Sequence, residues 1–101
     1  MKIAETIYTG TMLDANCEFS LLELCRVCDI DAHFAAVLVE EGVIEPLGEN
    51  TPFHWRFNGL MIRRVQIAVR LRRDLDINLP GIATVIQLLE ELQELRQMKR
   101  S

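Results

Sequence analysis

The sequence has no long hydrophobic run. The longest, Phe34–Val39, spans six residues, whereas a helix that crosses a bilayer needs about 18. The first residues include Lys2 and Glu5 but no apolar core of the kind found in signal peptides. We therefore expect neither a membrane span nor export, and we expect the chain to reside in the cytoplasm.

Cysteine is scarce, and its number is odd. Only Cys17, Cys25 and Cys28 are present, and reduced thiols are the usual state of such a set in a chain that is not exported. Cys25 and Cys28 have the spacing of a redox or zinc pair, but they fall at the C-terminal end of an expected helix, where the helix dipole disfavours a thiolate. A zinc site would need two more ligands, and Cys17, His33 and His54 do not supply a second pair. We therefore expect buried cysteines and no metal.

The sequence also lacks a recognisable catalytic set. It shows no nucleophile with a base and an orienting group, no glycine-rich phosphate loop and no convergent pair of carboxylates. Internal repeats and low-complexity segments are absent as well. We therefore expect no enzymatic activity and no cofactor.

The composition is that of an ordinary globular domain. Of 101 residues, half are hydrophobic and 26% are charged, and this length favours a single domain. The net charge of −4 is unevenly distributed: residues 1–50 hold ten acids and two bases, while residues 51–101 hold nine bases and five acids. Such a split is typical of a protein that binds charged partners, although the two halves could also neutralise each other within the fold.

The first clear secondary-structure signal follows residue 18. Ser20 and Glu23 have the spacing of a capping box, which predicts a helix over residues 21 to 28. Residues 1–18 come before this helix. Because Ile3–Thr9 favours β structure, we expect an N-terminal arm or an edge strand there.

A second short helix is predicted over Ala32–Glu41. Asp31 can cap its N-terminus, and Gly42 can end it. Two short helices joined by a tight turn are typical of a helix-turn-helix.

An aromatic segment follows the second helix. Val43–Pro46 has the composition of a short strand, a turn rich in glycine and proline comes next, and Phe53–Phe57 alternates aromatic and polar residues. This pattern predicts a β-hairpin wing. Trp55 and Phe57 are expected to pack on the core, an exposed aromatic binding site being the alternative.

Two amphipathic helices are predicted in the second half of the chain. Apolar residues from Leu60 to Leu75 cover more than half the circumference of a helix, which predicts a long helix packed between two neighbours. After a break at residues 74–80, Ile82–Leu95 has a narrower apolar face. Four of its residues keep the a/d spacing of a helix–helix seam, and we expect them to form a homodimer interface: Val85, Leu88, Leu92 and Leu95.

The order of these elements resembles a known family. The segment from Ser20 to Pro46 resembles the winged helix-turn-helix of MerR-type regulators. More specific similarities to the chaperone-modulator (CbpM) branch of that superfamily lie further on: Arg64, Ala68–Arg72, Asp74-Leu75 and Leu79–Ala83. The resemblance covers roughly Phe19 to Leu95, so residues 19–101 are expected to form one MerR-like modulator domain.

This resemblance implies both a fold and a function. The implied fold is mainly α: a winged helix-turn-helix with a β-hairpin wing, followed by a long helix and a C-terminal dimerisation helix. Members of that branch bind the J domain of a DnaJ-like, curved-DNA-binding co-chaperone (CbpA) and inhibit its stimulation of Hsp70. The alternative is a MerR-like DNA-binding transcriptional regulator.

The second helix of the helix-turn-helix distinguishes these two functions. In a DNA reader its early residues contact base edges through Arg, Lys, Asn or Gln, and Ala32–Glu41 contains none of these. Its acidic residues would face phosphates instead. Direct DNA binding is therefore disfavoured, and a protein partner is favoured.

In the family that this chain resembles, the partner's J domain presents a basic helix. We expect that helix to meet acidic residues around the second helix, with apolar neighbours holding the contact: Asp29, Asp31, Glu40, Glu41, Phe34 and Val39. The alternative contact is the basic stripe of the long helix, which is otherwise a solvated face: Arg63, Arg70 and Arg73.

The first prediction concerns DNA. At physiological salt and micromolar concentration, the purified protein is expected not to shift random or promoter DNA in a gel-mobility assay, because non-specific binding needs a basic footprint. A salt-sensitive, sequence-selective shift would contradict this expectation and favour the transcriptional regulator.

Overall fold

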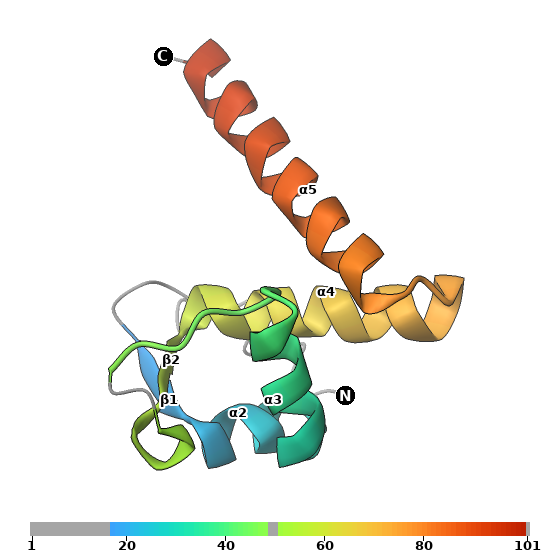
Figure 1. Cartoon of the computed structure of the whole chain (residues 1–101). Coiled ribbons are helices and arrows are strands. Elements are labelled where there is room, and N and C mark those ends of the chain that lie inside the picture. Colours follow the sequence, from blue (N-terminus) through green and yellow to red (C-terminus); the bar gives the residue numbers. More distant parts are fainter. Residues whose placement is uncertain (1–16, 49–50, 101) are drawn as a thin grey trace.

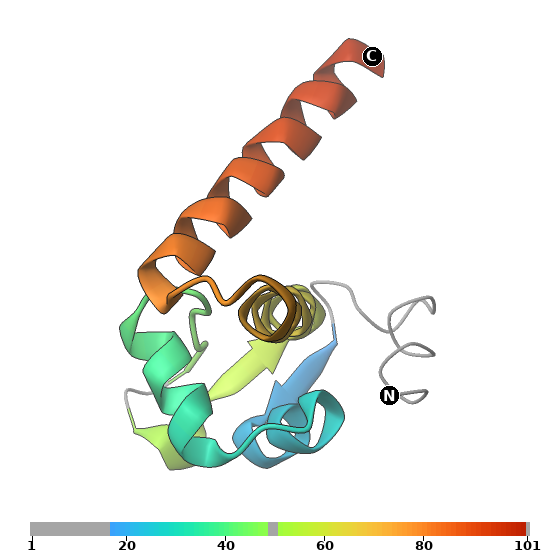
Figure 2. The same ribbon diagram turned by 90° about the vertical axis from the view of Figure 1, so that its right-hand side faces the viewer.

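The computed structural model describes residues 17–48 and 51–100. Its elements, in chain order, are β1 (Glu18–Ser20), α2 (Leu21–Cys28), α3 (Ala32–Glu40), the short 3₁₀ turn η1 (Pro52–His54), β2 (Arg56–Asn58), α4 (Gly59–Leu75) and α5 (Leu79–Arg100). In Figure 1, α5 projects away from a body formed by the other elements. Figure 2 looks nearly along α4 and shows the strands and α2 together on one side of it.

The helix-turn-helix forms as the sequence predicts. The Glu23 N–H donates to Ser20 Oγ (3.2 Å) while the Ser20 N–H donates to Glu23 Oε1 (2.8 Å), which completes the capping box of α2. At the start of α3, the Phe34 N–H donates to Asp31 Oδ1 (2.7 Å). α3 ends one residue earlier than expected and is followed by Gly42, whose φ of 76° is a conformation that glycine adopts without strain.

The strand pairing of the wing differs from the predicted hairpin. β2 pairs with β1 in antiparallel register, which places Phe57 opposite Phe19. On the other edge of β2, Leu47 forms a single bridge to Arg56 through two backbone hydrogen bonds of 2.7 and 2.9 Å. The wing therefore contributes one strand, β2, and a single bridge at Leu47. The second strand of the small sheet is β1, which comes from before the helix-turn-helix.

The expected strand Val43–Pro46 does not form. Val43 and Ile44 are both buried in the core, whereas successive side chains of a regular strand point to opposite faces. A strand here would remove one of the two side chains from the core, so the backbone follows an irregular path. The predicted aromatic strand begins at Arg56 rather than Phe53, because residues 52–54 form η1.

The aromatic residues of the wing divide between core and surface. Trp55 and Phe57 are buried, and their rings meet edge to face with centroids 6.0 Å apart. This agrees with the expected packing of the wing onto the core. Phe53 is 98% exposed, so it contributes nothing to that packing.

α4 lies between two sets of neighbours, as its broad apolar arc predicts. It packs against α2 and β2, and it also packs against α5. Ile62 and Val65 of α4 are buried in the same cluster as Ile82 and Ile86 of α5. The residues that cover α4 therefore come from both halves of the chain.

A charged contact reinforces this packing. The Arg64 guanidinium donates two hydrogen bonds of 2.7 Å to the carboxylate of Glu90, and it also reaches the Val43 carbonyl at 3.4 Å. This bidentate arrangement is the strong form of an Arg–carboxylate pair. It joins α4, α5 and the segment that follows α3.

The chain turns sharply between α4 and α5. Asp76 adopts a left-handed conformation (φ 52°) and ends α4, and the Gly81 N–H donates to Asn78 Oδ1 (2.8 Å) at the start of α5. Pro80 lies in the first turn of α5, where its missing N–H leaves no hydrogen bond unmade. α5 consequently begins before Ile82 and continues beyond Leu95, so it is longer than its apolar pattern indicated.

The predicted fold class is confirmed: the chain is mainly helical, with an antiparallel pair of strands beside a helix-turn-helix. The β structure expected in residues 3–9 lies outside the described residues. Within residues 17–48 and 51–100, no helix combines the length and apolar character that crossing a membrane requires.

The second prediction compares two leucines of α2. Leu24 is fully buried and Leu22 is 73% exposed. Leu24→Ala should lower the free energy of unfolding by about 2–5 kcal/mol, because it leaves a cavity in the core. Leu22→Ala should change it by less than about 0.5 kcal/mol. Urea denaturation followed by circular dichroism measures both, and equal losses would show that the core is not centred on Leu24.

Candidate functional site

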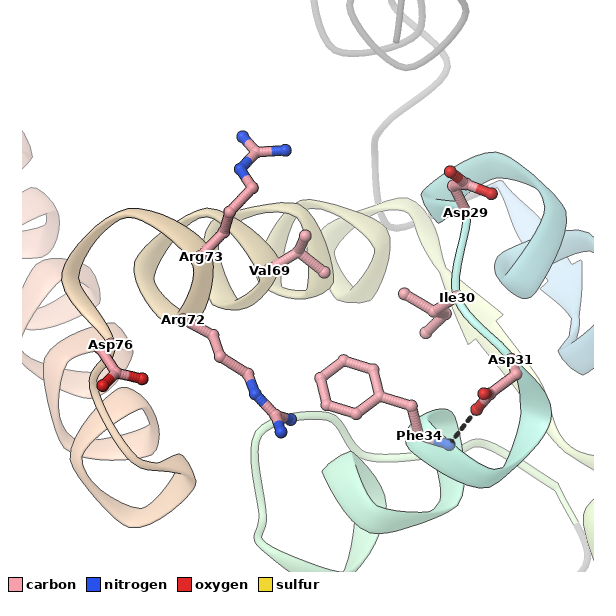
Figure 3. Close-up of a pocket in the computed structure, with 8 residues that line it drawn as sticks. All are labelled: Asp29, Ile30, Asp31, Phe34, Val69, Arg72, Arg73 and Asp76. Carbon is pink, nitrogen blue, oxygen red and sulfur yellow. Dashed lines mark hydrogen bonds between the residues drawn. The ribbon is translucent and has the colours of Figure 1, made fainter.

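An open pocket lies where the α2–α3 turn meets the C-terminal end of α4. Its volume is about 580 Å³, and Figure 3 draws the residues that line it. They come from three places in the chain and combine charges of both signs with apolar groups: Asp29, Ile30, Asp31, Phe34, Val69, Arg72, Arg73 and Asp76.

Two aspartates shape the wall that the α2–α3 turn contributes. Asp29 closes α2 in a left-handed conformation (φ 56°), which Asp and Asn adopt more readily than most residues. Asp31 opens α3, and one of its carboxylate oxygens holds the Phe34 N–H. Both side chains are exposed, so each carboxylate faces solvent at the rim of the pocket.

The opposite wall is built by Arg72 near the end of α4. Its guanidinium lies over the Phe34 ring, with the guanidinium carbon 5.0 Å from the ring centroid, which is within the range of a cation–π interaction. Figure 3 shows the Arg72 side chain reaching across the pocket toward that ring, while Arg73 points away from it. The Arg72–Phe34 contact therefore links α4 to α3.

The remaining charges stand near the end of α4. Asp76 ends that helix, and its N–H donates to the Arg72 carbonyl (3.1 Å). Arg73 pairs with the adjacent Asp74 through an exposed contact of 3.3 Å, a kind of ion pair that contributes little to stability. The pocket thus presents carboxylates on two sides and a stacked arginine between them.

The structure brings together only part of the predicted binding surface. Asp29, Asp31 and Phe34 line the pocket. Glu40 and Glu41 are exposed at the far end of α3, about 13 Å away by the rise of a helix of this length. Val39 is half-buried near that end. The predicted acidic surface therefore spans the length of α3, and the pocket lies at its N-terminal end.

The alternative basic stripe is divided as well. Arg73 lines the same pocket as Asp29 and Asp31. Arg63 is half-buried and lines a second pocket of about 190 Å³ between α4 and α5, and Arg70 is exposed on α4. The two surfaces that the sequence presents as alternatives therefore meet at Arg73.

Sequence reasoning missed Arg72, which is the arginine most engaged in the pocket. Its position in the helical pattern was the signal that could have identified it. Arg72 follows Val65 by seven residues and Ala68 by four, so it continues the buried face of α4. An arginine at the end of an apolar face must extend along that face to reach solvent. The helical pattern contained this information, but the identity of Phe34 as its neighbour required the tertiary structure.

The two helix-end cysteines have thiols rather than thiolates. Burial raises the pKa of Cys28 to about 12, and its Sγ lies 4.0 Å from the Ile62 carbonyl oxygen. Burial also raises the pKa of Cys25, and the nearby Asp31 adds to this effect. Across residues 17–48 and 51–100, no three His, Cys, Asp or Glu side chains are grouped so as to hold a metal ion.

α5 carries an apolar face that the described residues do not cover. Leu88, Leu92 and Leu95 are between 45% and 60% exposed, and Val85 is half-buried at the start of the same seam. Ile82 and Ile86, which lie on a different side of the helix, are buried against α4. The seam predicted for dimerisation is therefore accessible in this chain.

Comparison with known proteins identifies similar sequences over nearly the whole chain. The family described as MerR HTH family regulatory protein matches residues 19–101. A protein of Coxiella burnetii named chaperone modulatory protein CbpM is 30% identical over 99 residues, which cover 98% of this chain and 92% of that protein. Proteins of the same name from Pseudomonas entomophila and Pseudomonas putida are 34% and 33% identical over 79 residues, covering 78% of this chain and 77% of theirs.

Proposed function

The chain belongs to the MerR HTH family of regulatory proteins and, within it, to the CbpM-like chaperone modulators, and we propose that it binds the J domain of a DnaJ-like co-chaperone of the CbpA type. By occupying that domain in the cytoplasm, it inhibits the stimulation of Hsp70. It does so by contact alone, without a catalytic step. The name of its relatives, chaperone modulatory protein, supports a chaperone partner.

The surface of α3 is the observation on which this proposal rests. In a DNA-binding relative this helix would enter the major groove. Here its exposed side chains are Ala32, His33 and Glu40, and Glu41 is exposed immediately after it. None of these is an Arg, Lys, Asn or Gln, the residues that most often read base edges, and the carboxylates would repel phosphates.

The same acidic surface is complementary to a basic helix of a protein partner. Opposite charges speed and orient the encounter, while contacts near the centre of an interface supply most of the affinity. Phe34 and Val39 are both half-buried, so each retains apolar surface that a partner can cover. We propose that these two residues and the acids around them, Asp29, Asp31, Glu40 and Glu41, form the J-domain contact.

The third prediction tests this surface. The protein should lower the ATPase activity of Hsp70 that its J-domain co-chaperone stimulates, and the inhibition should weaken as salt rises because the charges are exposed. Glu40→Lys with Glu41→Lys should weaken the inhibition without unfolding the domain, since exposed positions tolerate such changes. The matched control is Glu91→Lys with Glu94→Lys on α5, which changes the net charge equally at exposed positions.

Two results would count against the proposal, at different levels. Full inhibition by the Glu40→Lys, Glu41→Lys variant would remove those acids from the contact, and a loss of inhibition by Arg63→Ala or Arg70→Ala would favour the basic stripe instead. Failure of the unaltered protein to inhibit would discard the function itself. A sequence-selective DNA complex would then favour the transcriptional regulator.

We also propose that the protein is a homodimer joined through α5. Leu88, Leu92 and Leu95 form an exposed seam with a/d spacing along a helix of 22 residues, and such a seam is stabilised by a second helix packed against it. A two-fold dimer that packs through this face would remove Leu88, Leu92 and Leu95 from water.

The fourth prediction measures this association. Light scattering at micromolar concentration should return about twice the chain mass of 11.6 kDa. Leu92→Glu should dissociate the pair, because it places a charge in apolar surroundings. Gln87→Glu introduces the same charge at an exposed position on another side of α5 and should leave the dimer intact. If light scattering of the unaltered protein returns the mass of a single chain, the dimer is excluded at that concentration.

A further inference from the structure

Arg72 is held in place by stacking and has hydrogen-bonding capacity to spare. Its guanidinium carbon lies over the Phe34 ring, 5.0 Å from the ring centroid, a cation–π contact that supplies no hydrogen-bond acceptor for its N–H groups. Among residues 17–48 and 51–100, no carboxylate forms an ion pair with it, although Asp31 and Asp76 line the same pocket. The stacked arginine is therefore pre-oriented for a hydrogen-bond acceptor from outside the described chain.

The acidic side of the pocket is also only partly used. Asp31 commits one oxygen to the Phe34 N–H, and the carboxylates of Asp29 and Asp76 are exposed. The pocket is therefore lined by side chains of both signs, and Figure 3 shows Arg72 lying between Asp76 and Asp31. Its natural complement is a segment that carries both an acceptor and a cation.

We infer that this pocket receives a segment of the J domain in which a carboxylate and a basic side chain lie close together. The carboxylate accepts two hydrogen bonds from Arg72, the geometry that a guanidinium favours. The basic side chain lies between Asp29 and Asp31. This inference rests on the proposed function and adds to it a positively charged contact, Arg72, within an otherwise acidic surface.

The charges in the pocket favour this occupant over two others. A nucleic acid would bring phosphates to Arg72 but no cation to the three aspartates. The pairing of two copies proposed above uses Leu88, Leu92 and Leu95 of α5, none of which lines this pocket. A J-domain segment with both signs satisfies each side of the pocket, so opposite charges set its orientation as well as its affinity.

Phe34 has a different role in this arrangement from that of an apolar contact alone. Its ring contacts the Arg72 guanidinium, and Asp31 accepts a hydrogen bond from the Phe34 N–H and so holds the backbone from which the ring extends. Phe34 is thus a positioning residue for Arg72. The sequence indicates only that it is apolar.

The fifth prediction compares two arginines of α4. Arg72→Ala and Arg70→Ala remove the same side chain from exposed positions two residues apart, but only Arg72 lines the pocket. With the full-length protein and the full-length co-chaperone in titration calorimetry, Arg72→Ala should weaken binding by at least about tenfold, and Arg70→Ala by less than about twofold. Thermal unfolding of each free variant shows whether the fold is retained.

Further variants separate a direct contact from a structural role. Arg72→Lys keeps the charge but loses the planar fork, so it should bind more weakly than the unaltered protein. Phe34→Leu keeps an apolar side chain but loses the ring face, and it should weaken binding to a similar extent. Arg72→Glu should bind poorly, and reversing one acidic residue of the J domain to lysine should restore that binding, which a merely structural role would not produce.

Several outcomes would overturn the inference while leaving the proposed function intact. One is an equal loss of binding affinity for Arg72→Ala and Arg70→Ala, and another is that no single acidic reversal in the J domain restores binding of Arg72→Glu. A change of mass in light scattering for Arg72→Ala would make a second copy of the chain the occupant. A DNA complex that depends on Arg72 would also overturn it. If the unaltered protein does not bind the co-chaperone at all, the proposed function fails first, and the inference fails with it.

Discussion

Burial of the apolar surface of α4 is the constraint on which the rest of the structure depends. Ile62, Val65 and Ala68 are fully buried, and no single neighbouring helix can cover an arc as broad as the one that this helix presents. α2 and β2 cover part of it, and the first turns of α5 cover another part. Because burial of apolar area is the main favourable term in folding, both halves of the chain are drawn onto α4.

The position of the candidate site follows from that packing. Once α4 is covered by α2 at one part of its length, its last turn extends past the α2–α3 turn and brings Arg72 over Phe34. The tight turns at Asp29 and Asp76, both with left-handed backbone, end α2 and α4 at the rim of the same pocket. Two helix ends and one helix start thereby contribute charges to one opening.

The charges on this site differ from those that a DNA reader with the same fold uses. A helix-turn-helix is a scaffold, and its function depends on which side chains it presents. Here the exposed positions of α3 are Ala32, His33 and Glu40, and Glu41 follows them, so the electrostatic term that dominates DNA binding is unfavourable. Arg72 lines the pocket together with three aspartates, Asp29, Asp31 and Asp76. That combination suits a protein partner with charges of both signs better than a uniform polyanion.

Local sequence signals determined the helices and their ends. The capping box of Ser20 with Glu23 depends on residues three apart, and so do the cap at Asp31 and the apolar periodicity of α4, so each can be identified without knowledge of the rest of the chain. The predicted strand pairing was wrong because β1 and β2 lie far apart in the sequence, and because Val43 and Ile44 are both buried, which a regular strand would not allow. The candidate site divides in the same way. Its acidic half could be identified from the helix-turn-helix pattern, whereas the contact of Arg72 with Phe34 joins α4 to α3, and only the packing of the folded chain brings those two helices together.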